Sequence, residues 1–198
     1  GLFSERLNKN FTPEQLVSHT FFVNYPEEFF KFYKEKLIYP DAKPNAAHIA
    51  LAKLEKMGKV KAVVTQNIDG LHQAAGSKNV YELHGSVLRN YCMKCHAFYD
   101  EIFILESEGI PTCPKCGGKV KPDVILYEEG LDDSTIRGAV NAIANADTLI
   151  IGGTSLVVYP AAGLIDYFRG KNIVLINKSS TSADNKANLV IHDAIGKV

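Results

Sequence analysis

Two polar clusters in this chain stand directly after apolar stretches that we interpret as strands. The first runs from Gln66 to Asp69 and follows the stretch 60–65, and the second is His84, which follows 80–83 and precedes a glycine. Open α/β sheets bind ligands at the carboxyl ends of their strands. A neutral imidazole near pH 7 can take a proton from a sugar hydroxyl. His84 is therefore a candidate general base, with a packing histidine as the alternative interpretation.

The four cysteines form two Cys-x-x-Cys pairs, Cys92 with Cys95 and Cys113 with Cys116, separated by 17 residues. Each pair predicts a tight turn that points two thiolates inward, and together the turns complete a tetrahedron that suits a structural zinc ion. Haem attachment is one alternative, because His96 completes a Cys-x-x-Cys-His pattern, and paired disulfides are another. Haem would need an exported chain and would leave the second pair unexplained, so we favour zinc.

A glycine-rich stretch, 152–155, follows the predicted strand 148–151 and precedes a predicted helix. Glycines let a phosphate approach the backbone, and hydroxyls and amides at a helix start can hold it. Asn177 and Lys178 follow another predicted strand and suit a ribose or a phosphate. Each of these features is also explained by an ordinary turn or cap. Taken with the cluster at Gln66, they predict one long cleft for a dinucleotide.

Composition limits the class of protein. The chain has 198 residues, 46% of them hydrophobic, which predicts one domain with a full core and a small insert. Acidic and basic residues balance at 22 each, so nothing favours nucleic acid or a membrane surface as a partner. No apolar run approaches the roughly 20 residues that span a bilayer, and the first five residues carry no signal pattern. We expect a cytoplasmic protein whose cysteines stay reduced.

The order of predicted elements is that of an α/β protein. Residues 1–44 predict a helical module, and residues 91–120 form the cysteine-bearing insert. Residues 45–90 and 121–198 alternate strands with helices, and their apolar strands show little alternation, as in a parallel sheet buried on both faces. We expect a doubly wound, Rossmann-like parallel sheet that carries the helical module and a small zinc ribbon. Its later elements are strands at 124–127, 173–176 and 189–191 and helices at 46–57, 134–144 and 160–169.

These motifs, in this order, resemble those of the sirtuins, the NAD-dependent protein-lysine deacylases. The resemblance covers nearly the whole chain and is carried by residues 66–72, 82–85, the two cysteine pairs, 153–163 and 176–178. It implies NAD as cosubstrate, one structural zinc ion, and acyl-lysine proteins or peptides as partners. The implied reaction moves the acyl group of lysine to ADP-ribose and releases nicotinamide.

The resemblance also implies roles for single residues. His84 is the general base, and Asn67 is the second catalytic residue. An extended peptide is gripped through main-chain hydrogen bonds between two segments, Ile125, Leu126 and Tyr127 on one side and Leu156, Val157 and Val158 on the other. The residues implied to hold NAD are Gln66, Asn67, Ile68, Asp69, Gly153, Thr154, Ser155, Asn177, Lys178 and Ala194.

The acyl group that is removed is predicted from one helix. Family members that prefer succinyl or malonyl lysine carry a Tyr-x-x-Arg pair, in which the tyrosine and a bidentate guanidinium hold the acyl carboxylate. Here Tyr33 keeps the tyrosine, but Lys36 stands at the arginine position. Lysine lacks the planar fork, so acetyl-lysine is favoured, with Tyr33 as a substrate contact. A solvated helix face is the alternative for both residues.

The chain departs from the family in one respect. Sirtuins begin with a first strand, a Gly-Ala-Gly loop and a Gly-Ile-Pro-Asp-Phe-Arg segment, and none of these is present. We therefore expect the strands beside the missing central strand to be unpaired, and the 198 residues alone to bind NAD poorly and to be inactive. Two other functions remain open: protein mono-ADP-ribosyl transfer in the same cleft, and a zinc-stapled binding module without catalysis.

Overall fold

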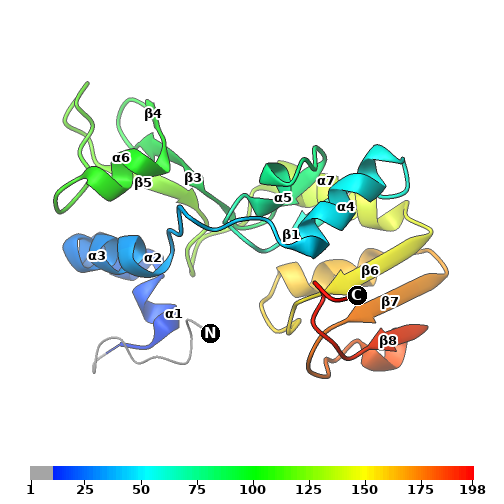
Figure 1. The fold of residues 1–198 in the computed structure, drawn as a ribbon. Coiled ribbons are helices and arrows are strands. Elements are labelled where there is room, and N and C mark those ends of the chain that lie inside the picture. The colour runs from blue at the N-terminus through cyan, green and yellow to red at the C-terminus, as the bar shows by residue number, and fades with distance from the viewer. Residues whose placement is uncertain (1–10) are drawn as a thin grey trace. The chain divides into compact units, whose positions relative to one another are not determined.

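The computed structural model describes residues 11–198, which fall into two compact units. Of the described residues, the first unit holds 11–42 together with 67–70 and 84–131, and the second holds 43–66, 71–83 and 132–198. Segments far apart in sequence therefore share a unit (Figure 1). Among the described residues, no helix is both long and apolar enough to cross a bilayer.

The first unit combines short helices with a small antiparallel sheet. Side-chain oxygens of Thr12, Ser18 and Asp100 accept amide hydrogens from the first turns of three of these helices, which fixes where each one begins. The sheet has the order β4-β3-β5. The elements are α1 (Pro13–Leu16), α2 (His19–Asn24), α3 (Pro26–Lys36), β3 (Gly85–Cys92), β4 (Phe98–Tyr99), α6 (Glu101–Glu106) and β5 (Val120–Val124).

Aromatic side chains fill the core of the first unit. The rings of Phe22, Phe29 and Phe30 meet edge to face with centroids 5.1–6.0 Å apart, and none of the three is more than 1% exposed. The same cluster includes Cys92 and Cys113. One core therefore supports both the helices and the cysteine-bearing turns.

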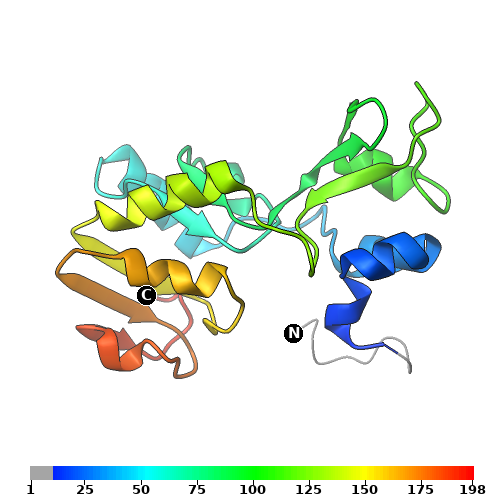
Figure 2. The same ribbon diagram turned by 180° about the vertical axis from the view of Figure 1, so that it is seen from behind.

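The second unit contains only parallel strand pairs. β1 pairs with β2, and a separate sheet has the order β6-β7-β8. Helix α7 packs on β2 and on the 3₁₀ helix η2, and Asp132 caps its amino terminus (Figure 2). The elements are α4 (Ala46–Lys56), β1 (Val63–Thr65), α5 (Leu71–Ala74), β2 (Val80–Glu82), α7 (Asp133–Ala144), β6 (Thr148–Gly152), η2 (Ala161–Tyr167), β7 (Asn172–Ile176), η3 (Asp184–Lys186) and β8 (Leu189–Ile191).

The predicted α/β class with parallel strands is confirmed. Within residues 11–198 the parallel strands form two sheets, because no strand pairing joins β1 to β6. The edge of β1 opposite β2 and the edge of β6 opposite β7 carry no strand of the described chain.

Two predicted elements differ from the structure. Residues 124–127 do not continue a parallel sheet, because Val124 ends β5, which returns beside β3 after the cysteine insert and so pairs with it in the antiparallel sense. The predicted helix 160–169 is the 3₁₀ helix η2, where the amides of Gly163 and Phe168 bond three residues back. Glycine is a weak α-helix former, which is consistent with the tighter turn.

Candidate active site and zinc centre

His84 joins the end of β2 to the start of β3. Its carbonyl accepts the Ile125 amide at 3.0 Å, and its side chain is partly exposed and lies outside the buried clusters. Gly85 follows with φ +76 and pairs with Val124. Only a residue without a Cβ adopts this conformation easily, so Gly85 fixes the direction in which the chain leaves His84.

An irregularity in β3 supports the predicted nicotinamide loop, residues 67–70. The pairing of β3 with β5 shifts register between Ser86 and Asn90. The Val87 amide in this bulge donates to the Ile68 carbonyl at 3.0 Å, and a Cβ on Gly70 would stand 2.5 Å from Leu88 Cδ1. Residues 67–70 are therefore bonded to β3, and His84 directly precedes the same strand. Gln66 follows β1 in the second unit, where Thr65 pairs with Glu82.

The residues predicted for the phosphate and adenosine side follow β6, β7 and β8 at one edge of that sheet. The Gly153 amide donates to the Ile176 carbonyl at 3.1 Å, and the Asn177 amide donates to the Ile191 carbonyl at 3.0 Å. Gly153 has φ +61, and the Thr154 hydroxyl accepts the Leu156 amide at 3.1 Å. Ser155 and Lys178 are exposed, and Ala194 is partly buried.

The helix predicted after the glycine-rich stretch, 160–169, is the 3₁₀ helix η2, which begins at Ala161. The intervening residues form no helix, so no helix amino terminus lies beside Thr154 and Ser155. Exposed backbone and hydroxyl groups are what this stretch offers to a phosphate.

The two segments predicted to grip a peptide lie in different units. Tyr127 is 39% exposed and forms a parallel bridge with Ser18 in the first unit, where Ile125 is partly buried and Leu126 is buried. In the second unit, Val157 is 69% exposed, Leu156 is buried and Val158 is partly buried.

The structure does not support Tyr33 as a substrate contact. Its ring is fully buried and stacks on Phe29 with centroids 5.6 Å apart. Burial, with a smaller effect from Asp123, raises the pKa of the phenol, and its hydroxyl has no hydrogen-bond partner among the described residues. The position on α3 that looked like a solvated or ligand-facing site belongs to the core, because the aromatic residues around it turn this face inward.

The four cysteine sulfurs converge on one point. All four lie within 4.8 Å of one another, with Cys92 to Cys116 at 3.4 Å and Cys95 to Cys113 at 3.6 Å. Tetrahedral zinc with Zn–S bonds of about 2.3 Å needs sulfurs roughly 3.8 Å apart, so the cluster fits zinc. The separations exceed the S–S bond length of about 2.05 Å, which excludes disulfides. The four sulfurs also account for both pairs together, which haem attachment did not.

Hydrogen bonds affect the ionisation of the cysteine thiols in this cluster. Burial opposes ionisation of Cys113, but bonds from Tyr99 and from the amides of Lys115 and Cys116 lower its pKa to about 6. The Gly118 amide favours the Cys116 thiolate, yet the neighbouring sulfurs and burial raise the pKa of Cys116 to about 12. A bound cation favours the thiolate form of such ligands.

Sequence reasoning did not identify the residues that hold the turn after Leu126. Glu129 contacts His19 and Lys121 there, and also accepts the Leu126 amide. His19 and Glu129 are 110 positions apart in the sequence, so no local sequence pattern predicts their contact.

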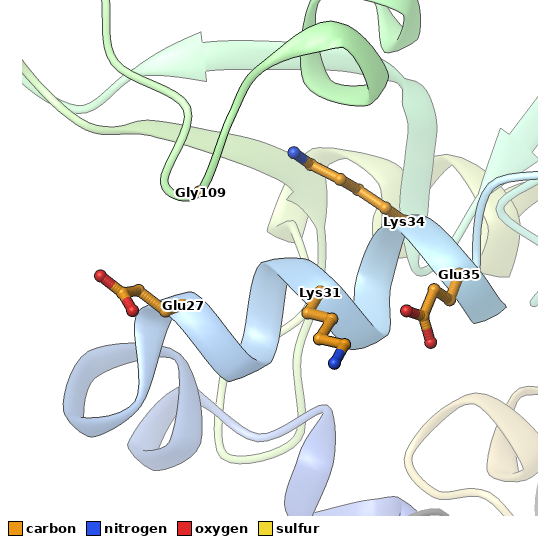
Figure 3. A pocket seen from close by; sticks show the side chains of 5 residues that line it. All are labelled: Glu27, Lys31, Lys34, Glu35 and Gly109. Atoms are coloured by element: carbon orange, nitrogen blue, oxygen red, sulfur yellow. The ribbon is translucent and has the colours of Figure 1, made fainter.

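A pocket of about 400 Å³ is lined by residues of α3 and by Gly109, in the loop after α6 (Figure 3). Its lining is charged, with Lys34 donating to the Ser107 carbonyl nearby, and burial lowers the pKa of Lys34. None of the predicted site residues lines it. The lining residues are Glu27, Lys31, Lys34, Glu35 and Gly109.

Comparison with known proteins gives matches over the whole chain. A family model described as "Sir2 family" matches residues 1–160. An "NAD-dependent protein deacetylase" of Clostridium perfringens is 79% identical over all of this chain and 82% of its own length, and one of Clostridium acetobutylicum is 65% identical over all of this chain and 81% of its own.

Solved structures match as well. One described as "Sir2 bound to acetylated peptide" has a TM-score of 0.86 at 41% identity, over 92% of this chain and 79% of its own. Another, "Sir2-p53 peptide-NAD+", has a TM-score of 0.86 at 40% identity, over 100% of this chain and 81% of its own.

Proposed function

Because this chain belongs to the Sir2 family, we propose that it is an NAD-dependent protein deacetylase, which transfers the acetyl group of acetyl-lysine to ADP-ribose and releases nicotinamide. The observation that carries the proposal is the placement of His84. Its partly exposed side chain lies between β2 and β3, directly before the strand whose Val87 amide bonds to the Ile68 carbonyl. That geometry suits a general base beside a nicotinamide pocket.

Bound NAD supplies a ribose carbon that the acetyl oxygen attacks as nicotinamide leaves. His84 accepts the proton of a ribose hydroxyl, so that this oxygen can attack the acyl carbon. The C–N bond to lysine then breaks, the lysine amine leaves with a proton, and one water molecule completes acetyl-ADP-ribose. Asn67 and Asp69 hold the nicotinamide end with Ile68, and Gln66 contacts the ribose. Water is kept from the sugar by the apolar residues around the acyl chain. The proposed contacts to the phosphates and the adenosine of NAD are made by Gly153, Thr154, Ser155, Asn177, Lys178 and Ala194.

The proposed peptide-binding residues are Ile125, Leu126 and Tyr127 in the first unit and Leu156, Val157 and Val158 in the second. The exposure of Tyr127 and Val157 supports this assignment. Main-chain recognition of this kind tolerates varied peptide sequences.

A cytoplasmic location suits the four cysteines, which form a metal cluster and no disulfide.

Substitution of His84 tests the proposal. In the complete protein, His84→Ala should abolish formation of acetyl-ADP-ribose and leave zinc content and the thermal midpoint unchanged. His96→Asn is a matched control, because His96 is exposed and has φ 57, a conformation that asparagine tolerates. Mass spectrometry of the products also separates deacetylation from mono-ADP-ribosyl transfer. Full activity in the His84 variant would rule out its role as base.

We also propose that residues 1–198 alone are inactive. The open edges of β1 and β6 in the described chain support this, because unpaired strand edges leave backbone groups without sheet partners. Nicotinamide release at the rate of the complete protein would refute it.

For the acyl group, the lysine at position 36 favours acetyl over succinyl. Faster cleavage of a succinyl peptide than of the same acetyl peptide would overturn that preference.

A further inference from the structure

A cluster of ionic contacts around Glu129 fastens the turn that follows β5. The Glu129 carboxylate contacts His19 Nδ1 at 2.9 Å and Lys121 Nζ at 3.2 Å. The same carboxylate accepts the Leu126 amide at 2.9 Å. The Glu129 side chain is only 18% exposed, against 49% for His19 and 22% for Lys121. A single carboxylate therefore ties three separate segments of the first unit together.

Main-chain hydrogen bonds complete this fastening. The Glu129 amide donates to the Leu126 carbonyl at 3.0 Å and closes the turn, in which Glu128 takes φ +76. The Tyr127 amide donates to the Val17 carbonyl at 3.0 Å, and the His19 amide donates to the Tyr127 carbonyl at 2.9 Å. The turn is thus bonded along its length to the start of α2.

The amides of residues 125–127 all donate hydrogen bonds within the first unit. Ile125 donates to the His84 carbonyl, Leu126 to the Glu129 carboxylate and Tyr127 to the Val17 carbonyl. A carbonyl oxygen has two lone pairs, so the carbonyls of this segment can still accept another bond. The 39% exposed Tyr127 side chain is available as well. The segment therefore presents a prearranged surface and does not need to reorganise on binding.

The Glu129 carboxyl group is ionised at neutral pH. Burial opposes ionisation, but the bonds from His19 and from the Leu126 amide, with the charge of Lys121, lower the pKa of the carboxyl below its usual value. The carboxylate therefore persists as an acceptor for all three partners.

We propose that Glu129 is a positioning residue for the substrate peptide, because its carboxylate holds the segment Ile125 to Tyr127 in the conformation that the peptide meets. The inference rests on the proposed assignment of that segment to peptide binding. A segment that is rigid before binding loses less conformational entropy when the peptide arrives. Glu129 touches neither NAD nor the reacting atoms in this scheme, so its loss affects peptide affinity selectively.

The test compares steady-state constants in the complete protein. Glu129→Ala should raise KM for an acetyl-lysine peptide about tenfold at saturating NAD, since one lost charge-assisted contact is worth roughly that factor. KM for NAD, measured at saturating peptide, should stay within twofold. Glu129→Gln keeps an oxygen that can accept the Leu126 amide and should recover part of the loss. Glu106→Ala, at an exposed glutamate on α6, is the matched control.

Photo-crosslinking separates this inference from the proposed function. An acetyl peptide carrying a benzophenone should crosslink to residues 125–129 in the parent protein. If it does, and Glu129→Ala leaves peptide KM unchanged or raises both KM values equally, the positioning role is overturned and the peptide assignment stands. If the peptide crosslinks elsewhere, the assignment of the segment fails, and the positioning role fails with it.

Discussion

Gly85 lies so close to Asp123 that a Cβ on the glycine would stand 1.9 Å from the Asp123 carbonyl oxygen. This contact is between β3 and β5, directly after His84. Backbone atoms cannot move aside as the end of a flexible side chain can. The approach of these two strands is therefore a direct constraint on the position of the proposed base.

Gly85→Ala should lower kcat strongly and destabilise the fold by about 1–3 kcal/mol, because φ +76 and the Asp123 contact both oppose a side chain. Urea denaturation and acetyl-ADP-ribose formation check the two effects. Gly58→Ala is the control, because Gly58 has φ +72 but nothing within 4 Å of its Cβ position. Equal effects of the two substitutions would show that backbone conformation alone, and not the Asp123 contact, matters at Gly85.

Acidification should release the zinc ion. Metal binding needs thiolates, so protons compete with zinc once the pH falls below the pKa of the ligands. Without metal, hydrogen bonds lower the pKa of the Cys113 thiol to about 6, and bound zinc moves the release to lower pH. A chromogenic chelator should report one zinc per chain at pH 7 and progressive release on acidification. Cys113→Ser should lower zinc content at pH 7, and full retention there would contradict the ligand assignment.

The cap of α7 should make stability depend on pH. The Asp132 carboxylate accepts bonds from the Ser134 hydroxyl and from the Thr135 amide and hydroxyl, which lower its pKa to about 2. A lowered folded-state pKa stabilises the fold above the unfolded value of about 3.9, and this stabilisation disappears as the pH falls towards 2. The difference in urea midpoint between the parent and Asp132→Asn should be present at pH 6 and shrink below pH 4. A constant difference would contradict this role for the charge.

The aromatic core of the first unit should be sensitive to truncation. Phe30 is fully buried and contacts the rings of Phe22 and Phe29, so Phe30→Ala should cost about 3–5 kcal/mol of unfolding free energy. Phe98→Ala removes a ring that is 56% exposed and should change stability by no more than about 0.5 kcal/mol. Chemical denaturation of both variants provides the measurement, and similar losses would argue against this core.

Features of short range were predictable from the sequence. The spacing within each cysteine pair predicted two turns, and the structure brings their sulfurs within 4.8 Å. The predicted helix 134–144 is α7, with Asp132 as its cap. The strands 173–176 and 189–191 are β7 and β8 within one residue. Local spacing and capping chemistry decide such features, because each depends on residues a few positions apart.

The sequence by itself determined the zinc ligands, the class of fold and the strand ends where the polar clusters stand, because these follow from local spacing and hydrophobic pattern. Only the tertiary structure decided that Tyr33 belongs to the core and that Glu129 meets His19 from 110 positions away. It also decided that β5 runs antiparallel beside β3 and that β1 and β6 do not pair. Such contacts depend on how distant segments pack, and an apolar strand or a single glutamate has the same local sequence whichever partner it meets.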